Sequence, residues 1–193
     1  MAEVLLFHHL LGLTPGVIAL ADRWRVAGHT VQTPDLFDGS TFTTLDDGMA
    51  FVTGHDHPDF DALADAAAAE MPDGVVYAGI SFGVMQAQRL AQTRPGTAGA
   101  VLMESCLPIN GEWAIGPWPD RVPVQVHGMD ADPIFAGEGD LDAARELVAS
   151  ADDAELFLYP GGVHLFEDES LPTFDAAATG LLTERVLALL ARI

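Results

Sequence analysis

The sequence predicts an α/β fold, with a mostly parallel, doubly wound sheet of about six strands and helices on both faces. Short apolar, β-branched segments alternate with helical patterns, as expected when each helix connects two parallel strands. No internal repeat or linker-like stretch divides the chain, so residues 1–193 are expected to form one domain. In such folds ligands bind at the carboxyl ends of the strands.

Each element has its own local signal. The first helix has the clearest boundaries, because Thr14 can cap it, Pro15 suits its first position and Gly28 follows its end. Two loops are expected: Asp35–Gly54, which is polar and without a clear period, and Leu107–Arg121, which is rich in proline, glycine and tryptophan. The expected strands are Glu3–His8, His29–Thr33, Gly74–Ile80, Ala98–Met103, Val122–His127 and Glu155–Tyr159. The expected helices are Pro15–Ala27, Asp59–Met71, Phe82–Thr93, Asp140–Ala149 and Phe174–Ala191.

The charge balance is strongly acidic. The net charge is −21, and all eight basic residues are arginines. Such a polyanion repels nucleic acid and anionic membranes, so neither is expected as a partner. A solvated acidic surface explains the balance, with adaptation to high salt as the alternative. Without a leader or a membrane-length apolar run, and with Cys106 as the only cysteine, we expect a cytoplasmic monomer or small homo-oligomer.

The strongest functional motif is Gly79-Ile80-Ser81-Phe82-Gly83, between an apolar strand and a helix. This strand–turn–helix context is typical of the nucleophile elbow of α/β-hydrolases, which raises a serine hydroxyl above the sheet edge. Small residues on both sides allow strand and helix to approach closely. The sequence therefore predicts an α/β-hydrolase fold with Ser81 as nucleophile.

A serine nucleophile needs a histidine base oriented by a carboxylate, in the chain order serine, acid, histidine. His164 follows the last predicted strand and is the expected base, whereas His127 is expected to pack or cap. Asp132 is the preferred acid because Pro133 favours an extended backbone there, with Asp130 as the alternative. The oxyanion donors are expected to be the N–H of Phe82 and one from residues 9–12.

Several segments together make the chain resemble the dienelactone hydrolase family over nearly its whole length. The resemblance implies Ser81, Asp132 and His164 as the triad, with Leu10 and Phe82 as backbone oxyanion donors. The segments that carry it are His9–Pro15, Thr33–Phe37, Gly79–Gly83, His127–Pro133 and Tyr159–Phe166.

Three positions depart from the family pattern. The namesake enzymes have cysteine at the position of Ser81, glutamate at that of His9, and a carboxylate-binding arginine at that of Asp168. An acid at the arginine position opposes an anionic lactone. We therefore expect a serine hydrolase of neutral or weakly polar esters or lactones, with a true dienelactone hydrolase or a non-catalytic binding module as alternatives.

No cofactor or metal is expected. The segment His55-Asp56-His57 superficially resembles a metal motif, but a helix begins directly after it, which favours a solvated loop. Two further residues are candidates for substrate contact. His9 lies at a strand end, with packing as the alternative, and Trp113 lies in a loop that it could instead anchor.

Overall fold

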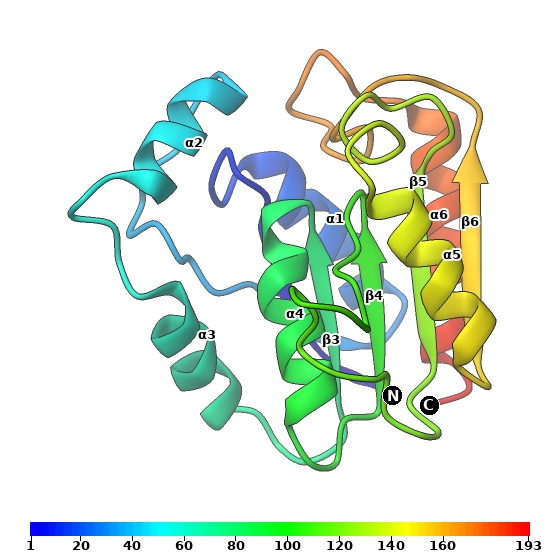
Figure 1. The fold of residues 1–193 in the computed structure, drawn as a ribbon. Coiled ribbons are helices and arrows are strands. Elements are labelled where there is room, and N and C mark those ends of the chain that lie inside the picture. Colours follow the sequence, from blue (N-terminus) through cyan, green and yellow to red (C-terminus); the bar gives the residue numbers. More distant parts are fainter.

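The computed structural model describes residues 1–193 and contains one six-stranded sheet, in which all strands run parallel in the order β2-β1-β3-β4-β5-β6. The α/β prediction is therefore confirmed, and the sheet is parallel throughout (Figure 1). The strands are β1 Glu3–Phe7, β2 Thr30–Gln32, β3 Val75–Ile80, β4 Gly99–Met103, β5 Val124–Met129 and β6 Ala154–Tyr159.

Helices cover both faces of this sheet and bury two separate apolar cores (Figure 1). One core includes side chains of α3, α4 and α5, and the other includes side chains of α1 and α6. Alternate residues of the strands feed the two cores, because successive side chains point to opposite faces. The helices are α1 Pro15–Val26, α2 Leu45–Thr53, α3 Phe60–Ala69, α4 Phe82–Thr93, α5 Asp140–Ser150 and α6 Ala176–Leu190. None of them is long and apolar enough to cross a membrane.

Helix α2 corrects the sequence prediction, which assigned Asp35–Gly54 to a loop. Thr44 starts the helix: its hydroxyl accepts the N–H of Asp47 and donates to the Asp47 carboxylate at 2.6 Å. A threonine followed three residues later by an acid is a pattern that marks a helix start, and it could have predicted α2 from the sequence. Gly48 obscured it, since glycine in a helix interior argues against a helix. A Cβ at Gly48 would overlap the carbonyl oxygen of Leu10, so close packing on the loop after β1 explains the glycine.

The strand order reverses direction between β1 and β3, which pair from Glu3–Val75 to Phe7–Gly79. A parallel sheet has its ligand crevice where the carboxyl ends of strands meet at such a switch point. The loops leaving β1, β3, β4 and β5 all open at this edge, as does the loop after β6 (Figure 1).

Candidate active site

Ser81 sits on the sharp turn between β3 and α4. Its backbone has φ 48° and ψ −112°, a region that residues other than glycine rarely adopt. The Ser81 N–H donates to the carbonyl oxygen of Met103 at 2.7 Å, which fixes the turn to the end of β4. Ser81 therefore has the strained backbone conformation that is typical of a nucleophile elbow.

The two glycines of the motif are required by close packing. A Cβ at Gly79 would overlap the backbone of Gly83, and a Cβ at Gly83 would overlap the carbonyl oxygen of Phe7 in β1. The first contact lets α4 leave β3 in a tight turn, and the second lets it lie directly over the sheet. Both glycines therefore place the serine at the carboxyl edge of the sheet.

The three residues predicted to form a triad lie in one hydrogen-bonded chain. His164 Nε2 lies 2.9 Å from Ser81 Oγ, and His164 Nδ1 lies 2.7 Å from Asp132 Oδ2. Such an arrangement suits proton transfer, because the base contacts the nucleophile and the acid orients the base. Ser81, Asp132 and His164 thus meet although they lie after three different strands, β3, β5 and β6.

Asp132 and Asp130, the two candidate acids, have different partners. Asp132 is fully buried, and its Oδ1 accepts the N–H of Ile134 at 2.9 Å. Burial alone would raise the pKa of Asp132, but hydrogen bonds from His164 and the backbone outweigh it and hold the pKa below its ordinary value. Asp130 is exposed, and its carboxylate accepts the N–H of Gly161 at 3.1 Å. Only Asp132 contacts the histidine.

Two backbone N–H groups are available beside the serine. Phe82 is the first residue of α4, so its N–H has no acceptor within the helix. The N–H of Leu10, in the loop after β1, also has no backbone acceptor, whereas that of Leu11 is held by His9 Nδ1 at 3.2 Å. These are the two donors that the resemblance implied for an oxyanion hole.

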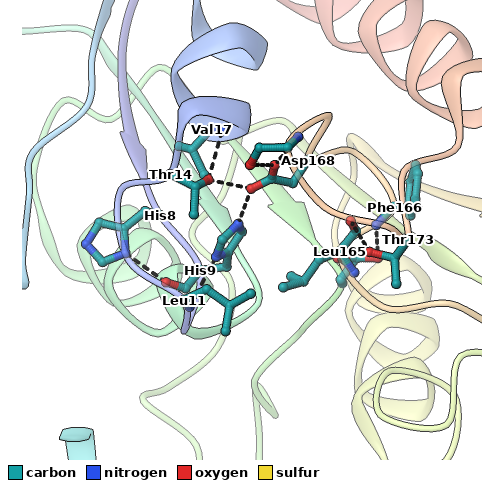
Figure 2. Close-up of polar contacts among 11 residues, drawn as sticks. His8, His9, Leu11, Thr14, Val17, Leu165, Phe166, Asp168 and Thr173 are labelled. Carbon is teal, nitrogen blue, oxygen red and sulfur yellow. Dashed lines mark hydrogen bonds and ion pairs between the residues drawn. The ribbon is translucent and has the colours of Figure 1, made fainter. Parts of the chain in front are cut away.

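His9 does not face the substrate side, contrary to its candidacy as a substrate contact. It is fully buried, and its Nε2 lies 2.8 Å from Asp168 Oδ2 (Figure 2). The Thr14 hydroxyl also donates to this carboxylate, which packs against Gly16 in the first turn of α1. Burial acts to raise the pKa of Asp168, but its hydrogen bonds with His9, Ser170 and Thr14 dominate and lower the pKa to about 2.

This buried pair also corrects the argument drawn from Asp168. At the sequence level, the acid was expected to stand where relatives bind a substrate carboxylate. In the structure its carboxylate is turned inward, against His9 and the start of α1 (Figure 2). The two departures from the family pattern therefore form one contact that joins the loop after β1 to the loop after β6.

Trp113, the other candidate for substrate contact, is exposed over 84% of its surface and is not among the residues that line the cavity at Ser81. Trp118 is buried instead, and its indole N–H donates to the carbonyl oxygen of Val122 at 2.8 Å. Trp118 thus anchors the loop, and neither tryptophan walls the pocket.

A cavity of about 520 Å³ opens at Ser81 and is lined mainly by apolar side chains. Met49 and Val52 of α2 form one wall, and Met85 and Leu107 contribute further apolar surface. Its charged lining residues are all acidic, namely Glu104, Glu138 and Asp140. The sequence did not reveal these walls, because α2 was assigned to a loop.

An aromatic cluster lies behind the α2 wall. Phe51 of α2 packs on Phe37 with ring centroids 4.9 Å apart, and Phe60 of α3 packs on Phe82 at 5.2 Å. Phe37 also contacts Phe82 at 5.5 Å, so the rings form a continuous group. We call Phe37, Phe42, Phe51, Phe60 and Phe82 the aromatic cluster.

One group of side chains has the composition of a metal site. Single ligand atoms of Glu104, Asp132 and His164 lie within 4.8 Å of one another. A metal there would compete with the His164 contacts to Asp132 and Ser81, so the arrangement fits a hydrogen-bonded chain better. The segment His55–His57 is exposed, with His57 stacked on Phe60, and it contributes to no such group.

The fold and this serine-centred geometry define the class of protein, an α/β-hydrolase. The chain belongs to the dienelactone hydrolase family, since the model of that family matches residues 1–193. It is therefore a hydrolase that acts on ester bonds of small molecules. No curated protein matches the sequence significantly.

Solved structures show the same fold at low sequence identity. A dienelactone hydrolase-like promiscuous phosphotriesterase, P91, from metagenomic libraries is similar with a TM-score of 0.73 at 20% identity, over 100% of this chain and 86% of that chain. A candidate dienelactone hydrolase from Klebsiella pneumoniae is similar with a TM-score of 0.69 at 19% identity, over 100% of this chain and 88% of that chain. A structure described with the metagenome-derived lipolytic enzymes LipS and LipT has a TM-score of 0.64 at 19% identity, over 100% of this chain and 94% of that chain.

Proposed function

We propose that the protein is a serine esterase that cleaves neutral or weakly polar carboxylic esters or lactones through an acyl-enzyme. Ser81 is the nucleophile, His164 the general base and Asp132 the acid that orients the imidazole. The observation that carries this assignment is the unbroken hydrogen-bonded chain from Ser81 Oγ through His164 to Asp132.

The mechanism follows from the geometry. His164 Nε2 takes the Ser81 proton as Oγ attacks the ester carbonyl, and the oxyanion accepts the N–H groups of Leu10 and Phe82. The imidazolium then protonates the departing alcohol, which leaves the acyl group on Ser81. Water, deprotonated by His164, attacks the acyl carbon. The imidazolium then returns this proton to Ser81 Oγ as the bond between Oγ and the acyl carbon breaks and the acid leaves. Asp132 stays ionised throughout, consistent with its lowered pKa.

The substrate class follows from the cavity lining. Apolar side chains from α2, α4 and the loop after β4 suit an apolar acyl or alcohol group. No basic side chain lines the cavity, and its charged groups are carboxyls, which favours uncharged substrates over an anionic lactone. The buried Asp168 no longer enters this argument, because its carboxylate does not face the cavity.

The test is labelling with a fluorophosphonate probe, which forms a covalent bond to an activated serine. We expect stoichiometric labelling of the wild type, none in Ser81→Ala and strong loss in His164→Ala. Ser105→Ala is the matched control, because Ser105 lines the same cavity but donates its hydroxyl to Asp140 at 2.6 Å. Labelling that persists in Ser81→Ala would refute the assignment. An inert but folded wild type would favour the non-catalytic alternative.

A further inference from the structure

Glu104 is a buried carboxyl beside the triad for which the proposed mechanism gives no role. It directly follows β4, is fully buried and has φ 59°, a backbone region rare for such a residue. Its N–H donates to the carbonyl oxygen of His127 at 2.7 Å, so the end of β4 is held against β5. A strained backbone and a buried acid together require a compensating contact.

That contact is the backbone immediately after His164. The Glu104 carboxylate accepts the N–H of Leu165 at 2.6 Å and the N–H of Phe166 at 3.3 Å. Leu165 itself has φ 60°, so the chain turns sharply just after the histidine. Without an acceptor, two buried N–H groups would be left unpaired at this strained turn, which would cost free energy. The carboxylate therefore stabilises the loop conformation that presents His164 to Ser81.

The charges around Glu104 come from several elements. Asp132 follows β5, Glu167 lies in the same loop as His164, Asp140 begins α5, and His9 follows β1. Burial raises the pKa of Glu104 well above its ordinary value, and the neighbouring carboxyls of Glu167 and Asp132 raise it further. Burial likewise raises the pKa of Glu167. Burial and these acidic neighbours favour the neutral form of the Glu104 carboxyl group.

Glu167 is buried beside Glu104, so the Glu104 side chain has an acidic and not a basic neighbour there. The N–H groups of Leu165 and Phe166 are therefore the donors that hold the Glu104 side chain in place. One Glu104 oxygen lies within 4.8 Å of a ring nitrogen of His164.

We propose that Glu104 is a positioning residue for His164: its carboxyl group fixes the backbone that follows the histidine and so holds the imidazole against Ser81. The inference rests on the proposed role of His164 as base. Glu104 thus acts on the reaction through the backbone that carries His164.

Three variants test the contact with the backbone after His164. Glu104→Gln keeps the length but turns an N–H₂ toward a backbone N–H. Glu104→Asp keeps the carboxyl group but is too short to hold both N–H groups. Glu167→Gln is the matched control, because Glu167 is a buried glutamate of the same loop that accepts neither of these N–H groups. Kinetics on a 4-nitrophenyl ester give kcat and KM, and the NMR signal of the His164 Nδ1–H, assigned with His164→Gln, reports its contact with Asp132 without substrate. Circular dichroism confirms folding.

For both Glu104 variants we expect kcat to fall about tenfold or more with KM nearly unchanged, since the interaction serves the transition state. In both Glu104 variants the NMR signal of the His164 Nδ1–H changes, because the imidazole no longer keeps its contact with Asp132. Glu104→Asp decides the question of positioning even if Glu104→Gln does not fold. Glu167→Gln retains most of kcat and the wild-type signal.

Wild-type kcat in both Glu104 variants would overturn the proposal, as would an unchanged His164 Nδ1–H signal in folded Glu104→Gln. A loss of kcat in Glu167→Gln as large as in the Glu104 variants would also overturn it. Failure of the esterase function itself is distinguishable, because the wild type would then neither label at Ser81 nor hydrolyse the ester.

Discussion

Asp130 and Asp132 lie two residues apart, and their different surroundings separate their roles. Asp132 points inward to His164, whereas exposed Asp130 closes a turn by accepting the N–H of Gly161. Chain order alone left both open, because either acid follows the same strand. Burial and the direction of the side chain make the distinction.

We therefore expect Asp132→Asn to lower kcat by about 10³-fold to 10⁴-fold, because an amide favours the wrong imidazole tautomer and cannot stabilise the imidazolium. The measurement is steady-state kinetics on a 4-nitrophenyl ester. Asp130→Asn is the matched control and should stay within a few-fold of the wild type. A greater loss in Asp130→Asn would reverse the assignment.

His9 and Asp168 illustrate how a single-position comparison can mislead. Each was interpreted as a change on the substrate side of the site: His9 stands where the namesake enzymes have a glutamate, and Asp168 stands where they have an arginine. The structure brings them together at 2.8 Å in the interior, where they form one buried contact (Figure 2). Contacts between positions 159 residues apart cannot be derived from local sequence patterns.

At the level of elements, α2 connects the cavity wall to the proposed oxyanion loop. Met49 and Val52 line the cavity, while Gly48 packs on the carbonyl oxygen of Leu10. The N–H of that same Leu10 is a proposed oxyanion donor. The position of α2 is therefore linked to the position of a donor.

Gly48→Ala is expected to destabilise the protein and lower kcat, because its methyl group must displace either α2 or the Leu10 peptide. Gly180→Ala in α6 is the matched control: it is also a helical glycine, but a Cβ there meets nothing within 4 Å. The control should raise stability by about 0.5–1 kcal/mol. Thermal unfolding and ester kinetics of both variants provide the measurement. Equal effects would contradict the proposed contact.

The sequence predicted the elements with strong local signals. The elbow at Ser81 combines a buried strand, close-packed glycines and a helix start, and each of these is legible over a few residues. Helix α2 was missed because its capping pair at Thr44 precedes a glycine whose purpose is tertiary. Glu104 was also missed, since its partners Leu165 and Phe166 are backbone groups about sixty positions away. Local pattern fixes neither packing nor such long-range acceptors.

At the scale of the whole molecule, the protein has a net charge of −21. The charged residues that line the cavity at Ser81 are also all acidic. The ion pairs that use the arginines are exposed surface pairs, such as Arg23 with Glu169 and Arg192 with Asp153. Such pairs add little stability, and they leave most of the negative charge uncompensated. The resulting field opposes the approach of anions.

We expect this field to appear in the salt dependence of turnover. For a 4-nitrophenyl ester with a carboxylate at the far end of its acyl chain, kcat/KM should rise with ionic strength, because salt screens the repulsion. The uncharged ester of equal chain length is the control and should be nearly insensitive to salt. A fall in kcat/KM for the anionic ester would indicate a favourable site for its charge and would revive the dienelactone alternative.

The aromatic cluster has a consequence for how substrates enter. Phe51 of α2 and Phe82 at the elbow belong to the same packed group of rings, joined through Phe37. Swinging α2 outward would open that group and disturb the residue that offers an oxyanion N–H. The packed rings therefore oppose an outward movement of α2, and we expect the size of the cavity to limit the length of the ester chain that the enzyme accepts.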